Sequence, residues 1–214
     1  MDDREEVEAY SLADFDDVNR RCARRALRAA ALDRGHALDL GTGPADIPIA
    51  LCRLAPGWRV TALDQSPRML RVARKNVARA KLRGRIRLLR TDAKAVRGLT
   101  QRVNLVMSNS LLHHLPDPIP FWFEVKRLAR KDGAILVQDL CRPRSRKAAR
   151  NLVTRHARTE PPLLRQLFYQ SLLAAFTPGE VRAQLRTANL TGLSVRQIND
   201  RHLVVRRAHA STSS

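Results

Sequence analysis

Three acidic residues in the first half of the chain each stand at the end of a short apolar run. Asp39 lies in ALDLG, Asp64 in VTALDQ and Asp92 in RLLRTD. A carboxylate accepts hydrogen bonds from ribose hydroxyls or an exocyclic amine, and it attracts a cationic group. Taken alone, Asp64 and Asp92 could each be only a helix-capping residue. Together, after three successive strands, they predict a site for a ligand that combines a cation, a ribose and an adenine.

A glycine turn beside the first acid could hold such a ligand. Gly41 and Gly43 separate an apolar run from a helical pattern in ALDLGTGPADIPIAL, residues 37–51. Glycines permit a sharp turn and close approach of a ligand to the backbone, and the helix start offers free N–H groups. A dinucleotide-binding G-x-G-x-x-G would need glycine at position 46, where Asp46 stands. Asp39 beside the turn suits a cationic group better than a pyrophosphate.

The elements that must position these residues can be read from the apolar pattern. Short runs alternate with helical stretches, which is typical of a mainly parallel sheet covered by helices. The expected strands are His36–Leu40, Trp58–Leu63, Ile86–Leu89, Val103–Met107 and Ala134–Val137. The expected helices are Ala45–Ala55, Pro67–Leu82 after the N-cap Ser66, and Pro120–Arg130.

The second half of the chain has a different pattern. Residues 142–160 are basic and irregular. Helices are expected over Leu163–Phe176 and over Val181–Ala188, the latter behind a capping box that begins at Thr177. Strands Leu193–Ile198 and His202–Arg206 predict a hairpin. The predicted fold class is α/β, with a doubly wound, mainly parallel, seven-stranded Rossmann-like sheet, a C-terminal antiparallel hairpin and a helical substrate cover.

Composition narrows the class of protein. No apolar run approaches the length of a membrane span, and the acidic start MDDREEVEAY is unlike a signal peptide. Cys22, Cys52 and Cys141 lie far apart in no metal-ligand spacing, so we expect neither a disulfide framework nor a metal site. These features predict a cytoplasmic protein and leave its oligomeric state open.

The net charge of +20 admits two interpretations. Residues 1–17 contain eight acids and one base, so the remaining residues carry +27. A basic body attracts nucleic acid or other polyanions. However, only six of the 40 bases are lysine, which favours a coding bias, and aromatic residues are 4% of the chain, too few for an obvious base-stacking surface. Nucleic acid is therefore a possible but less favoured partner.

Four motifs resemble those of the class I S-adenosylmethionine-dependent methyltransferases. They are DLGTGPAD, with Ala45 where the family usually has a third glycine, ALDQSPRML, TDAKA and VMSNSLLHHLPD. The resemblance covers roughly residues 30–142 and implies S-adenosylmethionine as cofactor. It assigns Gly41 and Gly43 to the methionine part, Asp64 to the ribose and Asp92 to the adenine. Within this family, the motifs are most similar to those of enzymes that methylate small molecules, such as the quinone-biosynthesis C-methyltransferases.

Site residues follow from the same resemblance. The expected cofactor-binding residues are Asp39, Gly41, Thr42, Gly43, Asp64, Gln65, Asp92, Ala93, Ser108 and Asn109. His113 is the expected catalytic residue, because histidine titrates near neutrality and can act as a base where the acceptor must lose a proton. The expected substrate-binding residues are His114, Asp139, Arg142 and Tyr169. Structural hydrogen bonding is the alternative role for the histidines, and Phe168 is expected in the core.

The sequence also predicts a division of the chain. Residues 31–214 would form the methyltransferase domain, with 142–176 as a substrate cover. Residues 1–30 would form an acidic, helical lid, because the negative charge of residues 1–17 is attracted to the basic body and Tyr10, Leu12, Phe15 and Val18 form an apolar stripe. The alternative is that residues 1–17 are a disordered, solubilising tail.

The sequence favours methyl transfer to a small molecule. Enzymes that methylate nucleobase amines often carry an Asn/Asp-Pro-Pro-aromatic cluster, where this chain has Ser108-Asn109-Ser110-Leu111. The alternatives are an RNA methyltransferase that uses the basic surface and a non-catalytic S-adenosylmethionine-binding protein.

Overall fold

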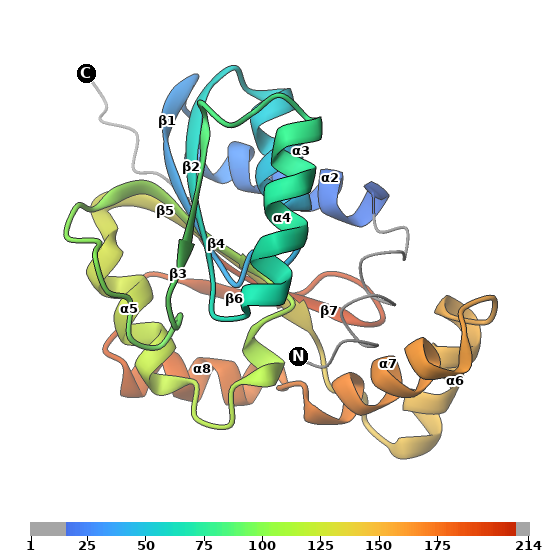
Figure 1. The fold of residues 1–214 in the computed structure, drawn as a ribbon. Coiled ribbons are helices and arrows are strands. Elements are labelled where there is room, and N and C mark those ends of the chain that lie inside the picture. The colour runs from blue at the N-terminus through green and yellow to red at the C-terminus, as the bar shows by residue number, and fades with distance from the viewer. Residues whose placement is uncertain (1–15, 209–214) are drawn as a thin grey trace.

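The alternating strands and helices form one seven-stranded sheet between two layers of helices (Figure 1). This computed structural model describes residues 16–208. The strands are β1 (Arg34–Leu40), β2 (Gly57–Asp64), β3 (Ile86–Arg90), β4 (Val103–Asn109), β5 (Ala129–Leu140), β6 (Ser194–Gln197) and β7 (His202–Arg207). The helices are α2 (Asp16–Ala30), α3 (Asp46–Leu54), α4 (Pro67–Arg79), α5 (Ile119–Leu128), α6 (Arg146–His156), α7 (Pro162–Ala174), α8 (Pro178–Thr187) and the short 3-10 helix η1 (Leu112–His114).

The sheet has the order β3-β2-β1-β4-β5-β7-β6. Strands β1 to β5 pair in parallel, and β7 runs antiparallel to both β5 and β6. Because β7 is antiparallel to both neighbours, β6 points in the same direction as β5. The carboxyl ends of six strands therefore meet at one edge of the sheet, where open α/β sheets bind ligands. The predicted α/β fold with its terminal hairpin is confirmed.

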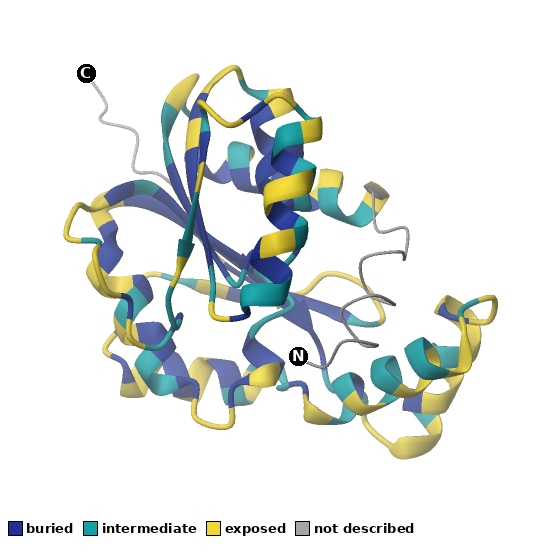
Figure 2. Cartoon of the chain, viewed as in Figure 1, coloured by how far each residue is buried: buried dark blue, intermediate teal, exposed yellow. Residues whose placement is uncertain are grey.

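Two buried clusters fill the space between the sheet and its helices. One joins α2, α3 and α4 to one face, and the other joins α5 and α8 to the opposite face. On α2, fully buried alanines such as Ala23, Ala26 and Ala30 let the helix lie close to the sheet. Trp122 of α5 donates its indole N–H to Gln184 of α8 at 3.0 Å. Figure 2 shows the central strands buried along most of their length and the outward helix faces exposed.

The predicted irregular segment 142–160 is wrong, because residues 146–156 form α6. The Ser145 side chain accepts a hydrogen bond from the Ala148 N–H at 3.1 Å and caps the helix. Ala149 and Leu152, three positions apart, are buried in a small third core with Leu172 of α7. Only these few apolar positions are packed, so the many basic residues on the outer face hid the helical period.

The boundary between α5 and β5 differs from the sequence prediction. The helix expected to reach Arg130 ends at Leu128, and β5 begins directly at Ala129. In the predicted lid, Tyr10, Leu12 and Phe15 lie outside the described residues, whereas residues 16–30 form α2 against α3 and β5. Within residues 16–208, no helix combines the length and the apolar character needed to cross a membrane.

The capping box at Thr177 gives a stability prediction. Its side chain accepts from the Glu180 N–H at 3.3 Å, and the Glu180 carboxylate accepts from the Thr177 N–H at 2.8 Å. Thr177→Ala should lower the free energy of unfolding by about 1 kcal/mol, because the first turn of α8 loses a cap. Thr177→Ser, which keeps the hydroxyl, is the matched control. Urea denaturation measures both, and equal midpoints for the alanine variant and the wild type would contradict the prediction.

Candidate active site

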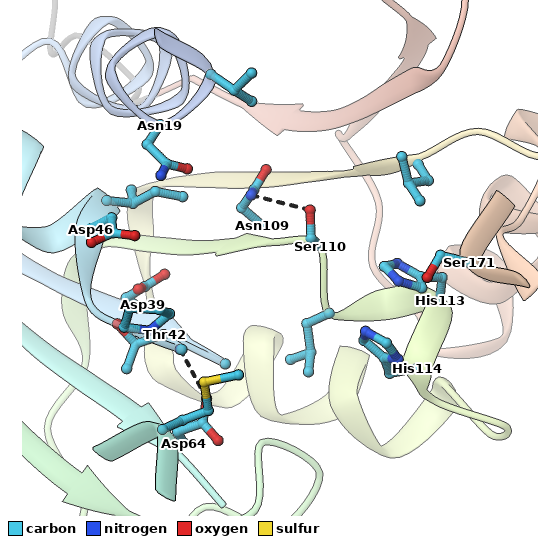
Figure 3. Close-up of a pocket in the computed structure, with 18 of the residues that line it drawn as sticks. Asn19, Asp39, Thr42, Asp46, Asp64, Asn109, Ser110, His113, His114 and Ser171 are labelled. Carbon is cyan, nitrogen blue, oxygen red and sulfur yellow. Dashed lines mark hydrogen bonds between the residues drawn. The ribbon is translucent and has the colours of Figure 1, made fainter. Parts of the chain in front are cut away.

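A pocket of about 280 Å³ opens at the carboxyl edge of the sheet (Figure 3). Its acidic half is lined by loops that follow β1, β2 and β3 and by the start of α3. Its helical half is lined by η1, α6, α7 and the turn between β6 and β7. Figure 3 shows the carboxylates on one side, the two histidines of η1 on the other, and Asn109 and Ser110 between them.

The glycine turn shapes the acidic half. Gly41 (φ 75°) and Gly43 (φ 53°) both take left-handed backbone conformations that favour glycine. A Cβ at Gly41 would lie 2.9 Å from the Leu111 side chain, whereas one at Gly43 would meet nothing within 4 Å. Gly43 therefore leaves open space beside its backbone. Ala45, in place of the third glycine, is also left-handed (φ 67°), a strained conformation for alanine.

Asp39 is a buried carboxylate at the floor of the acidic half. It is 2% exposed, and it forms no ion pair with any residue between 16 and 208. Burial raises the pKa of Asp39 to about 7; the Thr42 side chain lowers it in part, and the charge of Asp64 raises it. A ligand cation placed against Asp39 would favour its ionised form.

Asp64 ties the glycine turn to the start of α4. One carboxylate oxygen accepts from the Gly43 N–H and the other from the Ser66 N–H, each at 2.9 Å. Burial raises the pKa of Asp64, and these hydrogen bonds oppose the rise. Asp92 is more accessible, and its carboxylate accepts from the Lys94 N–H at 2.8 Å.

His113 forms a buried dyad with Asp139. The His113 Nδ1 lies 2.6 Å from the Asp139 carboxylate, which also accepts from the N–H groups of Leu112 and Leu140 at 2.7 Å. The two backbone N–H groups show that the Asp139 carboxylate acts as a hydrogen-bond acceptor. It therefore accepts from His113 as well, so the His113 Nδ1 carries the proton. In the neutral ring, Nε2 is then the nitrogen with a free lone pair.

His114 lines the pocket beside His113. The two ring centroids are 4.0 Å apart. Burial, aided by the neighbouring His113 and opposed by Asp139, lowers the pKa of His114 to about 4. His114 is therefore neutral near pH 7 and contributes a polar but uncharged wall.

The structure brings most of the predicted site residues together. Those that line the pocket are Asp39, Gly41, Thr42, Gly43, Asp64, Gln65, Asp92, Ala93, Asn109, His113 and His114.

Four predicted residues lie away from the pocket surface. Ser108 is buried and donates to the Leu40 carbonyl at 2.7 Å. Asp139 is buried behind His113, whose ring it contacts, and is not among the described lining residues. Arg142 forms an ion pair with Glu180 of the α8 capping box. Tyr169 packs against the small core of α6 and α7.

The pocket has further lining residues. Arg201 and His202 of the hairpin and Asn19 of α2 were missed by the sequence prediction. Phe168, expected in the core, packs against the small core of α6 and α7 and also lines the helical half. His156 of α6 and Val18 of the predicted apolar stripe line the pocket as well. The sequence could have indicated Arg201 and His202. They follow β6, and because β6 runs in the same direction as β5, its carboxyl end lies at the edge of the sheet where α/β folds bind ligands.

Comparisons with known proteins agree with this geometry. A family model described as a methyltransferase domain matches residues 37–133. A search of the curated proteins finds no match to the sequence. Among solved structures, a SAM-dependent methyltransferase from Aquifex aeolicus superposes with a TM-score of 0.70 at 18% identity, over 97% of this chain and 99% of that one.

Two more solved structures show the same fold. An O-methyltransferase family protein from Burkholderia thailandensis has a TM-score of 0.63 at 18% identity, over 92% of this chain and 59% of that one. Human N-acetylserotonin methyltransferase in complex with SAM has a TM-score of 0.62 at 17% identity, over 90% of this chain and 52% of that one.

Residues 37–133 are thus a methyltransferase domain, and the seven-stranded sheet has the fold of S-adenosylmethionine-dependent enzymes.

The raised pKa of Asp39 predicts a pH-dependent stability. In the unfolded chain Asp39 ionises near pH 4, but in the folded protein only near pH 7. The folded state therefore binds the extra proton between these values, and its stability falls as pH rises through them. Asp39→Asn removes this loss, which is at most about 4 kcal/mol. The stabilisation by Asp39→Asn should grow from pH 4 to pH 7 and then level off.

Thermal unfolding without cofactor, at several pH values, measures this effect. Asp33→Asn, at an exposed carboxyl just before β1, is the matched control and should show no such trend. A stabilisation by Asp39→Asn that stays constant with pH would contradict the raised pKa.

Proposed function

We propose that the chain is a class I methyltransferase that uses S-adenosylmethionine as its cofactor and transfers the methyl group to a hydroxyl group of a small molecule, with His113 as the general base. The observation that carries the proposal is the buried contact of 2.6 Å between His113 Nδ1 and Asp139 at the wall of the pocket. Bound S-adenosylmethionine supplies a methyl group activated by its sulfonium centre. The chain's own residues then have to align the acceptor and take its proton.

The acidic half fits the cofactor. A buried carboxylate without a cationic partner among the described residues, Asp39, suits the cationic methionine end. Asp64 has carboxylate lone pairs left for the ribose hydroxyls, and Asp92 is accessible to an adenine amine. Gly43 adds open space beside the backbone. We assign Thr42, Gln65, Ala93 and Asn109, which line the same half, to the walls of this cofactor site.

The contact between His113 and Asp139 supports a general base at the end of the pocket opposite the acidic half. Asp139 fixes the ring of His113 and keeps the proton on Nδ1, so that Nε2 is the basic nitrogen. His113 lines the pocket, whereas Asp139 does not, so Asp139 acts as a positioning residue through His113. A hydroxyl acceptor needs such a base, because its oxygen must lose a proton as the methyl group arrives.

The pocket itself supports a small acceptor over RNA. Arg201 is the sole arginine or lysine among its described lining residues, although the chain contains 40 such residues. Helix α7 contributes Leu164, Leu167 and Phe168, which give the helical half one apolar wall. A phosphodiester chain would need several cations near the reacting group. The solved human enzyme of the same fold is named for a small molecule, N-acetylserotonin.

Cofactor binding gives the first test. Asp92→Ala should weaken S-adenosylhomocysteine binding by about 1.5–3 kcal/mol if its bond to the adenine is charge-assisted. Asp92 is partly exposed, so this variant should stay folded. Asp33→Ala, at the opposite edge of the sheet, is the control and should bind like the wild type. Isothermal titration calorimetry decides, and a wild type that does not bind the compound would refute the proposed function.

The base gives the second test. His113→Gln should lower kcat by about 10²–10⁴-fold, because proton removal is lost from the methyl-transfer step. Asp139→Asn should shift the pH–rate profile, because it disturbs the ring that His113 presents. The assay follows transfer of labelled methyl groups to a panel of small hydroxylated compounds, with folded RNA as the competing acceptor class.

Retained S-adenosylhomocysteine affinity in both variants is the control for folding. Full activity of His113→Gln would exclude the base. Methylation of RNA alone would exclude a small acceptor, and a product methylated at carbon, as in the quinone-biosynthesis enzymes, would exclude the hydroxyl.

A further inference from the structure

One cation, Arg201, stands among the described residues that line the helical half of the pocket. Arg201 lies in the turn between β6 and β7, opposite the apolar side chains of α7. Its guanidinium carbon lies 5.6 Å from the centroid of the Phe168 ring. The acidic half of the pocket holds four carboxylates and no arginine or lysine among its described residues. Among the described lining residues, the helical half has one cation and one carboxylate, Glu160, whereas the acidic half has carboxylates alone, so an anion is repelled less in the helical half.

The turn that carries Arg201 is fixed by hydrogen bonds. The Asn199 side chain accepts from the N–H groups of Arg201 at 3.0 Å and His202 at 2.8 Å, and the Arg201 carbonyl accepts from the Cys141 N–H at 2.8 Å. The last contact joins the turn to the end of β5, close to Asp139. The backbone of Arg201 is thus held beside the dyad, and its long side chain reaches over α7.

The guanidinium of Arg201 has a charge that the surrounding residues do not neutralise by contact. Its side chain makes no hydrogen bond or ion pair with any residue from 16 to 208. The neighbouring Asp200 carboxylate is held by Arg155 at 3.0 Å and His156 at 2.8 Å. Burial lowers the pKa of Arg201, Asp200 raises it, and Arg21 of α2 lowers it. An anion bound here would gain a partly desolvated partner with five N–H donors.

We propose that Arg201 binds the carboxylate of the methyl acceptor, which is a flat, apolar hydroxy acid. The inference rests on the proposed function, since it places the acceptor hydroxyl at His113. The ring or chain of the acid would pack against Leu164, Leu167 and Phe168, and the carboxylate would pair with the planar guanidinium. A monoanion fits better than a phosphate, because one guanidinium stands there and Glu160 also lines this half.

The experiment compares acids with their neutral amides on the full chain saturated with S-adenosylhomocysteine. The probes are 4-hydroxyphenylacetate and 3-(4-hydroxyphenyl)propanoate, which place the carboxylate at two distances from the hydroxyl. Calorimetry should show that the wild type binds at least one acid more than about tenfold tighter than its amide. Arg201→Gln should remove this preference, and Arg201→Lys should retain part of it, since lysine keeps the charge without the planar fork.

Arg165→Gln is the matched control. Arg165 lies on the exposed side of α7, outside the pocket, so this variant should keep the preference for the acid. Loss of the preference in the control would show that the net charge of the surface, and not Arg201, attracts the acid.

Several outcomes would overturn the inference. These are equal binding of acids and amides by the wild type, no binding of either acid, or an unchanged preference in Arg201→Gln. A loss of S-adenosylhomocysteine affinity in Arg201→Gln would instead assign the guanidinium to the carboxylate of the cofactor. The proposed function fails separately, through absent cofactor binding or full activity of His113→Gln, so the two failures can be told apart.

Discussion

The pocket depends on the parallel pairing of β1 with β2 and β4. The register sets Asp39 opposite Ala62 on one side and Met107 on the other, so the ends of three strands are level at one edge. In an antiparallel arrangement, alternate strands would end at opposite edges, and the acids after β1 and β2 would lie a strand length apart. Burial on both faces, through the two cores that flank the sheet, enforces this arrangement.

This alignment also explains why the buried acids are tolerated. Asp64 is held by N–H groups of the glycine turn and of the α4 start, and Asp139 by N–H groups at η1 and at the end of β5. Strand ends and helix starts leave such donors without partners in the backbone ladder. For Asp39, burial raises the pKa to about 7, and only the Thr42 side chain opposes the rise. The folded chain thus keeps one carboxylate poorly satisfied at the position where a cation is expected.

The sequence carried enough information for the sheet and for the acidic half of the pocket. Glycine positions, apolar runs and acids at strand ends depend on local patterns, and the structure places Asp39, Gly43, Asp64 and Asp92 together as expected. The helical half depends on how distant elements pack. Helix α6 escaped detection because only Ala149 and Leu152 mark its buried side. Arg142 and Tyr169 were expected in the pocket because of their side-chain types alone. In the structure, Arg142 instead forms an ion pair with Glu180, and Tyr169 packs against the small core of α6 and α7.

The position of β7 between β5 and β6 has a consequence for how the chain assembles. Strand β7 is the last of the seven in sequence, yet it forms the inner neighbour that links β6 to the sheet. While the chain is being synthesised, β6 emerges with no partner, and β5 keeps an open edge until residues 202–207 arrive. An open strand edge is a template for pairing with other chains. A nascent chain is therefore exposed to aggregation until β7 pairs with β5 and β6. The same pairing brings Arg201 and His202 to the pocket.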